Sequence, residues 1–356
     1  MSTEAEIEKI EEEIKKTPYH KGTQAHIGRL KARLAKLREA KEKSSGKSYG
    51  PGFSVKKTGD ATVLLVGFPS VGKSTLINAI TNAESKTGAY DFTTLDVIPG
   101  MLEYRGAKIQ ILDIPGMISG AASGKGRGRQ VLSVVRNADL IVIILDDMKQ
   151  LEPIRKELYA AGFRLDEHPP DMRIVKKETG GVFVNFGMKK PKLEKAAVIS
   201  VIGEFKIHNA EVLIRENVNM DQLIDFLAGN RIYIPSVTVF NKVDRMDEAS
   251  VRSIGKNIIK ISASWGQNLE AFREAIWDKL KLARIYMKRI GKDPDMKEPM
   301  IMKKGCTIAV IGEKILKSHY RYFKFARIWG SSARFEGQKV GAEHVLVDGD
   351  IVELHA

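Results

Sequence analysis

The sequence predicts a multidomain α/β protein whose largest domain is built on a parallel β-sheet. Short apolar segments alternate with helical stretches between residues 61 and 146, and a further apolar segment follows at 236–242. Such alternation is typical of a parallel sheet with helices on its faces. The chain has 356 residues, of which 43 % are hydrophobic, and this length suits two or three domains with their own cores.

Composition restricts the classes of function that need consideration. The 58 Lys and Arg residues outnumber the 44 Asp and Glu residues, which gives a formal net charge of +14. This surplus favours polyanionic partners such as nucleotide phosphates, nucleic acid or anionic lipid, with an ordinary basic protein as the alternative. Cys306 is the single cysteine, so an intrachain disulfide and a cysteine-rich zinc site are excluded. We see no secretory signal and no apolar run long enough for a membrane span, and therefore expect a cytoplasmic protein.

Residues 1–50 are expected to form a helical N-terminal region. Ile7, Ile10 and Ile14 recur at helical spacing, and a second such series follows Pro18. This pattern predicts a helical hairpin. The second helix is rich in basic residues, which could contact RNA or pack on another domain: Lys31, Arg33, Lys36, Arg38, Lys41 and Lys43.

The rest of the chain divides into an interrupted domain and a C-terminal unit. We expect the α/β domain at 60–164 and 236–290, ending in an amphipathic helix over 268–290. The segment 165–235 is too long for an ordinary loop and contains strand-like and helical pieces, so we expect a small inserted α+β subdomain there. Residues 291–356 form a last compact unit, with strands expected at CTIAVIG, HVLVD and DIVELH.

A phosphate-binding motif follows the first apolar segment. Residues 67–74 read Gly-Phe-Pro-Ser-Val-Gly-Lys-Ser and match G-x-x-x-x-G-K-[ST], the P-loop. In this loop backbone N–H groups surround phosphate oxygens, the lysine reaches the β- and γ-phosphates and the hydroxyl binds Mg²⁺. We assign Lys73 to catalysis and Ser74 to Mg²⁺. The expected nucleotide-binding residues here are Gly67, Pro69, Ser70, Val71, Gly72, Lys73, Ser74 and Thr75.

Three further motifs follow strand-like segments in the order that a nucleotide switch requires. Asp113-Ile-Pro-Gly116 supplies a carboxylate for Mg²⁺ and a glycine N–H for the γ-phosphate. In Asn241-Lys242-Val-Asp244, the carboxylate of Asp244 can accept two hydrogen bonds from guanine that adenine cannot donate. Backbone N–H groups of a third motif can contact the guanine carbonyl. The expected base-binding residues are Asn241, Lys242, Asp244, Ser262, Ala263 and Ser264.

These motifs resemble the G1, G3, G4 and G5 motifs of translation-factor-class GTPases. By resemblance, the remaining motif lies in Phe92-Thr93-Thr94-Leu95, where we assign Thr94 to Mg²⁺ and to catalysis, with Thr93 as the alternative. The sequences at 67–70, 92–95 and 116–128 also resemble the Obg/DRG family, and specifically its developmentally regulated GTP-binding protein (DRG) branch. That resemblance implies a P-loop NTPase G domain, an S5D2-like insert at 165–235 and a ubiquitin-like β-grasp TGS domain at 291–356.

The resemblance implies Mg²⁺-dependent hydrolysis of GTP to GDP and phosphate by a switch that acts on ribosomes or ribosomal RNA. Some relatives also act with a stabilising protein partner. Met117 stands where Ras-like enzymes have a water-orienting glutamine, so we expect slow intrinsic turnover. Some relatives bind K⁺ through a P-loop asparagine, but Ser70 occupies that position, which leaves K⁺ as a hypothesis. Two alternatives stay open: a P-loop ATPase, and an RNA-binding module in which the nucleotide is mainly structural.

Overall fold

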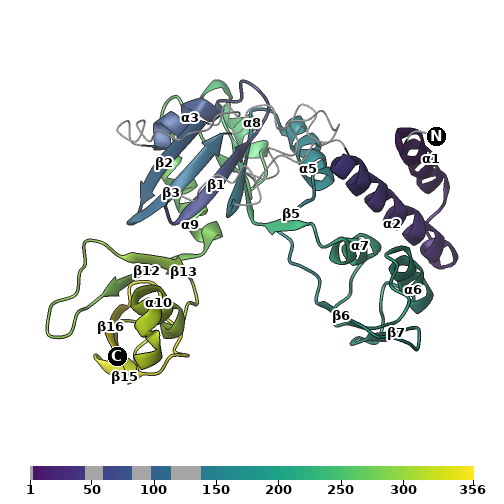
Figure 1. Cartoon of the computed structure of the whole chain (residues 1–356). Helices are drawn as coiled ribbons and strands as arrows, with labels where there is room; N and C mark the ends of the chain where they lie inside the picture. Colours follow the sequence, from purple (N-terminus) through teal and green to yellow (C-terminus); the bar gives the residue numbers. More distant parts are fainter. Residues whose placement is uncertain (1–2, 45–58, 82–97, 114–137) are drawn as a thin grey trace. The chain divides into compact units, whose positions relative to one another are not determined.

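The computed structural model describes residues 3–44, 59–81, 98–113 and 138–356 (Figure 1). The chain forms two compact units, which we describe separately. One unit contains the N-terminal helices and residues 158–233. The other contains the central sheet and the chain from residue 234 to the C-terminus.

A six-stranded sheet, in the order β11-β10-β4-β1-β3-β2, forms the centre of the second unit. All neighbouring strands pair in parallel except β2, which runs antiparallel along β3. Every residue of β1 and β4 is buried, which explains their continuous apolar sequences. The parallel α/β fold expected from the sequence is confirmed. The strands are β1 (Ala61–Val66), β2 (Ile98–Tyr104), β3 (Ala107–Asp113), β4 (Leu140–Leu145), β10 (Ser236–Phe240) and β11 (Ile259–Lys260).

Helices α3 (Lys73–Ile80) and α9 (Leu269–Leu280) share one buried core with this sheet. Alternate strand residues such as Val63 and Leu65 point into this core, where they meet Leu76 and Phe272. Because the parallel strands end at one edge, the loops that follow β1, β3, β4 and β10 start close together. The remaining helical elements of this part are η2 (Met148–Gln150), α5 (Leu151–Ala160), η3 (Val243–Arg245) and α8 (Glu248–Ser253).

Three secondary-structure predictions for the C-terminal third are wrong. The helix expected over 268–290 ends at Leu280, because Lys281 takes the left-handed conformation (φ 51°) and the chain continues as strand β12 (Leu282–Met287). The strand expected at CTIAVIG is instead helix α10 (Ile308–Leu316). The expected strand HVLVD is outside the named strands, although Val345 forms one bridge to Thr307. Short apolar runs fit either period, which explains the error at CTIAVIG.

The C-terminal domain is a five-stranded mixed sheet, in the order β13-β12-β16-β14-β15, with α10 packed on one face. Strand β12 belongs to this sheet and not to a helix of the preceding domain. Ile308 and Ile311 of α10 are fully buried against sheet residues such as Ile328. The other elements are β13 (Met300–Lys303), η4 (Lys317–Tyr322), β14 (Phe325–Trp329), β15 (Gln338–Val340) and β16 (Ile351–His355).

The first unit consists of a helical hairpin packed on a small α/β subdomain. The hairpin joins α1 (Thr3–Lys16) to α2 (Lys21–Ser44), and α2 packs on α6 (Lys195–Glu204) and α7 (Met220–Ala228). The sheet of the subdomain has the order β6-β8-β7. A separate two-stranded sheet pairs the segments where the chain enters and leaves this part. The strands are β5 (Phe163–Leu165), β6 (Met172–Lys176), β7 (Val182–Phe186), β8 (Ala210–Ile214) and β9 (Ile232–Ile234).

Four basic side chains of α2 form contacts within this unit. Arg33 and Arg38 form ion pairs with Glu6 and Glu11 of α1, and Lys31 pairs with an aspartate of α7. Lys36 donates to a backbone carbonyl of α6. The sequence left two roles open for the basic residues of this helix, contact with RNA and packing on another domain. These four residues take part in intramolecular packing.

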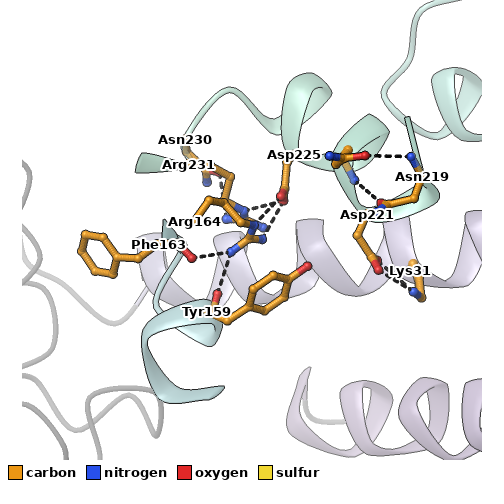
Figure 2. Close-up of polar contacts among 10 residues, drawn as sticks. Lys31, Tyr159, Phe163, Arg164, Asn219, Asp221, Asp225, Asn230 and Arg231 are labelled. Atoms are coloured by element: carbon orange, nitrogen blue, oxygen red, sulfur yellow. Dashed lines mark hydrogen bonds and ion pairs between the residues drawn. The ribbon is translucent and has the colours of Figure 1, made fainter. Parts of the chain in front are cut away.

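A buried ion-pair network lies beside the two-stranded sheet (Figure 2). The guanidinium of Arg164 donates to both carboxylate oxygens of Asp225 at 2.6 and 2.8 Å, and both side chains are 4 % exposed. Arg231 donates to the same carboxylate at 2.8 Å. Arg164 also donates to two backbone carbonyls and lies 3.6 Å from the ring centre of Tyr159. Each polar group of this pair is therefore satisfied, as burial requires.

We expect Asp225→Asn to destabilise the chain by about 3 kcal/mol, because it leaves two arginines around an uncharged group in a buried site. The matched control is Asp221→Asn in the same helix, which removes only the partly exposed pair with Lys31 (Figure 2). Such pairs contribute up to about 1 kcal/mol. Urea denaturation of both variants measures the difference, and equal losses would contradict a special role for the buried network.

Candidate nucleotide-binding site

The P-loop connects β1 to α3, and in this structure its lysine binds backbone carbonyls of the same loop. The ammonium group of Lys73 donates to the carbonyls of Gly67 and Phe68, each at 3.0 Å. Gly72 has φ 95°, and a Cβ atom at this position would lie 2.4 Å from the Nδ2 atom of Asn241. The second glycine of the motif is therefore required both by the backbone conformation and by a neighbouring side chain.

Asn241 joins the P-loop to the loop that carries Ser262 and Ala263. Its Nδ2 atom donates to the carbonyl of Val71 at 2.8 Å, and its Oδ1 atom accepts from the N–H of Ala263 at 3.0 Å. Asn241 is 2 % exposed, so both amide groups need partners inside the protein. The side chain follows β10 and the P-loop follows β1, and β4 lies between these two strands. The asparagine thus sets the spacing between the phosphate and base ends of the candidate site.

Lys242 makes a second link to the P-loop. Its ammonium group donates to the carbonyl of Ser70 and to the Oδ2 atom of Asp146, both at 2.7 Å. Burial alone would raise the pKa of Asp146, but the hydrogen bonds from Lys242 and Gln150 outweigh it and lower that pKa. Asp146 follows β4 directly. Asp146 lies outside the sequence motifs, although an aspartate at the end of a buried strand is a signal that the sequence carries.

The base-binding candidates lie beside these links. Asp244 is exposed in the short helix η3, two residues after Lys242, where its carboxylate is open to a ligand. Ser262 is fully buried, and its hydroxyl accepts from the N–H of Trp265 at 3.3 Å. This bond shapes the turn that presents Ala263 and Ser264. Asp244 and the Ser262–Ser264 turn therefore flank Asn241, as recognition of guanine requires.

Asp113 is an acidic residue at the end of β3, the strand that pairs with β1 before the P-loop. It pairs in register with Leu65 of β1, one residue before the last residue of that strand. It is 4 % exposed, and its Oδ1 atom has no hydrogen-bond partner among the described residues. Burial raises the pKa of Asp113 and the charge of Lys73 opposes that shift. A buried carboxylate oxygen without a partner fits a cation or its water ligand, which agrees with the expected Mg²⁺ site.

The structure thus brings Lys73, Ser74 and Asp113 to the edge of the sheet that also carries Asn241 and Asp244. Ser74 and Thr75 are exposed in the first turn of α3, where free N–H groups favour an anion. The remaining predicted switch residues, Thr94 and Gly116, lie outside the described residues, and so do Thr93 and Met117.

Family models match the chain over most of its length. A model described as a 50S ribosome-binding GTPase matches residues 62–177, and a model of the C-terminal region of that domain matches residues 179–282. The TGS domain model matches residues 283–356. The first residue of that match lies in β12, in agreement with the strand's place in the C-terminal sheet. Among the described helices, none is long and apolar enough to cross a membrane.

Related proteins are similar to this chain over almost its whole length. An uncharacterised GTP-binding protein of Methanocaldococcus jannaschii is 51 % identical, covering 99 % of this chain and 93 % of its own length. Developmentally regulated GTP-binding protein 1 of Xenopus laevis is 44 % identical, covering 99 % and 98 %. A solved YchF GTPase of Schizosaccharomyces pombe aligns with a TM-score of 0.47 at 16 % identity, covering 84 % of this chain and 99 % of its own. The chain belongs to the developmentally regulated GTP-binding protein family of Obg-class GTPases, and consists of a GTP-binding G domain and a TGS domain preceded by a helical hairpin.

Proposed function

We propose that this chain hydrolyses GTP to GDP and phosphate in a Mg²⁺-dependent reaction, and that the bound nucleotide switches its binding to ribosomes or ribosomal RNA. The hydrolase part is supported chiefly by one observation: Asp113 ends β3, and Lys73 begins the helix that follows the P-loop after the paired strand β1. This arrangement offers a cation and a carboxylate at the position where the phosphates of GTP would lie.

The chain's own residues supply most of the chemistry in this proposal. Lys73 would exchange the carbonyls of Gly67 and Phe68 for phosphate oxygens and stabilise the charge that develops in the transition state. Mg²⁺ would neutralise the β- and γ-phosphate oxygens, with Ser74, Thr94 and Asp113 as its protein ligands. Asp244 would accept two hydrogen bonds from guanine. Thr94 and the N–H of Gly116 would report the γ-phosphate to the following loops.

We expect slow release of phosphate from GTP by the purified chain with Mg²⁺, and a rate at least ~100-fold lower for Lys73→Met. Chelation of Mg²⁺ should stop the reaction. As an independent readout, Mg²⁺ should slow GDP dissociation from the natural chain and have less effect on Asp113→Asn. Phosphate release that survives Lys73→Met would contradict the assignment. Equal rates in K⁺ and Na⁺ would remove the K⁺ hypothesis.

Guanine selection has its own test. We expect Asp244→Asn to weaken GTP binding about 100-fold, because the amide cannot accept two N–H groups as the carboxylate does. The same variant should bind xanthosine triphosphate better than the natural chain does, since xanthine has a carbonyl where guanine has the 2-amino group. Competition against a fluorescent guanine nucleotide measures both changes. Equal competition by ATP and GTP on the natural chain would instead favour the ATPase alternative.

Three observations support a ribosomal or RNA partner. The net charge is +14. The family model that matches residues 62–177 is described as a 50S ribosome-binding GTPase. In the C-terminal domain, exposed cations lie among partly exposed aromatic rings, and such a surface suits phosphates and unpaired bases. The exposed cations expected from the sequence are Lys314, Lys317, Arg321, Lys324, Arg327 and Arg334. A ribosomal role would imply a cytoplasmic location.

On the outer face of the C-terminal sheet, cations and aromatic rings follow a regular arrangement. Arg327 on β14 pairs in register with Lys339 on β15, and both are exposed. Lys339 lies 4.1 Å from the ring centre of Phe325, which also stacks on His355. Cations and aromatic rings therefore alternate on one face, opposite the face that α10 covers.

We expect the chain to sediment with ribosomes more strongly in the presence of a non-hydrolysable GTP analogue than with GDP, and less at higher salt. Arg327→Gln combined with Lys339→Gln should reduce the slope of log affinity against log salt by about 0.7 for each lost phosphate contact. Arg252→Gln with Lys256→Gln, on the G domain, is the control of equal charge. Nucleotide-independent binding would favour the RNA-binding module, and no binding would remove the ribosome from the proposal.

A further inference from the structure

We propose that Asp146 is a positioning residue for guanine nucleotides, because it holds Lys242 and, through Lys242, the carbonyl of Ser70 in the P-loop. This inference rests on the nucleotide site proposed above and extends it to a residue outside the four sequence motifs. The interaction joins three loops, which follow β4, β10 and β1.

The carboxylate of Asp146 is fixed from both sides. Its Oδ2 atom accepts from Lys242 at 2.7 Å, and its Oδ1 atom accepts from the side-chain amide of Gln150 at 2.8 Å. The carbonyl oxygen of the same Gln150 side chain accepts from the N–H of Asp146 at 3.3 Å. Both carboxylate oxygens are therefore occupied, and the side chain has little freedom to turn away from Lys242.

Lys242 depends on this carboxylate for its position. The lysine and Asp146 side chains are 26 % and 25 % exposed, so neither charge is fully solvated. The other partner of the ammonium group is a neutral carbonyl, that of Ser70. A charge-assisted hydrogen bond is about twice as strong as a neutral one, so the carboxylate contributes most of the force that keeps this flexible side chain over the P-loop. Without it, the ammonium group gains by moving toward water.

The P-loop in turn depends on Lys242. Ser70 has φ 65° and Lys242 itself has φ 65°, a left-handed conformation that is unfavourable for residues other than glycine. Such conformations persist when surrounding contacts enforce them. The Lys242 bond to Ser70 is one such contact, and the Asn241 bond to Val71 is the next along the loop. Loss of the Asp146 charge should therefore loosen the loop and leave the guanine contact of Asp244 unchanged.

The test is the dissociation rate of fluorescent GDP and GTP analogues from the full chain, measured by stopped flow. Asp146→Asn should release both nucleotides about tenfold faster, because the charge-assisted bond becomes an ordinary one. Asp147→Asn is the matched control, since this neighbouring carboxylate is exposed and accepts from the N–H of Lys149 within its own turn. That control should leave both rates unchanged. Preference for guanine over xanthine nucleotides should not change in either variant.

A double-mutant cycle with Lys242→Met separates positioning from a general structural effect. If Asp146 acts through Lys242, then Asp146→Asn should add little to the rate already raised by Lys242→Met. Additive effects would overturn the inference. Unchanged nucleotide dissociation from the Asp146→Asn variant would also overturn the inference. If Asp244→Asn nevertheless weakened GTP binding, the proposed nucleotide site would stand. If neither variant changed nucleotide binding, the site itself would be wrong.

A second variant covers the case in which Asp146→Asn unfolds more readily in urea. Gln150→Leu keeps the charge of Asp146 and removes the side-chain amide that donates to its Oδ1 atom and accepts from its N–H. It should raise both dissociation rates in the same direction and by less than tenfold. Unchanged rates for this variant, together with a destabilised Asp146→Asn, would mean that Asp146 serves folding and not nucleotide positioning.

Discussion

Two adjacent side chains at the end of β10 determine the shape of the candidate site. Asn241 and Lys242 donate to the adjacent carbonyls of Val71 and Ser70, so the segment proposed to bind the base is hydrogen-bonded directly to the P-loop. Both contacts cross β4, which separates β10 from β1 in the sheet. The first contact also requires glycine at position 72, because any Cβ atom there would collide with the Asn241 amide. The segments proposed to bind the phosphates and the base are therefore parts of one hydrogen-bonded arrangement.

The sequence predicted those features that are encoded by local patterns. Continuous apolar runs identified β1 and β4, since a parallel sheet covered on both faces selects for apolar residues at every position. The motif residues that lie among the described residues were found at strand ends, as a parallel sheet dictates. The predicted helix over 268–290 was wrong because Lys281 adopts a left-handed conformation, which no sequence pattern indicated. The predicted strand at CTIAVIG was wrong because a short apolar run fits both a strand and a helix.

Contacts between distant parts of the chain could not be predicted in the same way. The link between Asp146 and Lys242 spans 96 residues, and it exists because β4 and β10 are neighbours in the sheet. Nothing in the sequence between these residues fixes that strand order. The same reasoning applies to Arg164 and Asp225, which are 61 residues apart. Residues of this kind become visible only when strands are placed side by side.

Two buried carboxylates, Asp225 and Asp113, differ in a way that separates structure from function. Asp225 is surrounded by two arginines that satisfy both of its oxygens, as a residue with a purely structural role requires. Asp113 is equally buried, yet one of its oxygens has no described partner and burial raises its pKa. A protein that needed Asp113 only for stability would gain by replacing it with an apolar residue, as its neighbours Ile111 and Leu112 illustrate.

The same distinction applies to positive charge. A net charge of +14 marks the whole chain as basic but does not say which surface meets a polyanion. On α2, Lys31, Arg33 and Arg38 pair with carboxylates and Lys36 donates to a backbone carbonyl, so these four cations contribute to packing. On the outer face of the C-terminal sheet, Arg327 and Lys339 are exposed beside aromatic rings. This face of the C-terminal sheet therefore suits a polyanionic partner better than those four cations of α2 do.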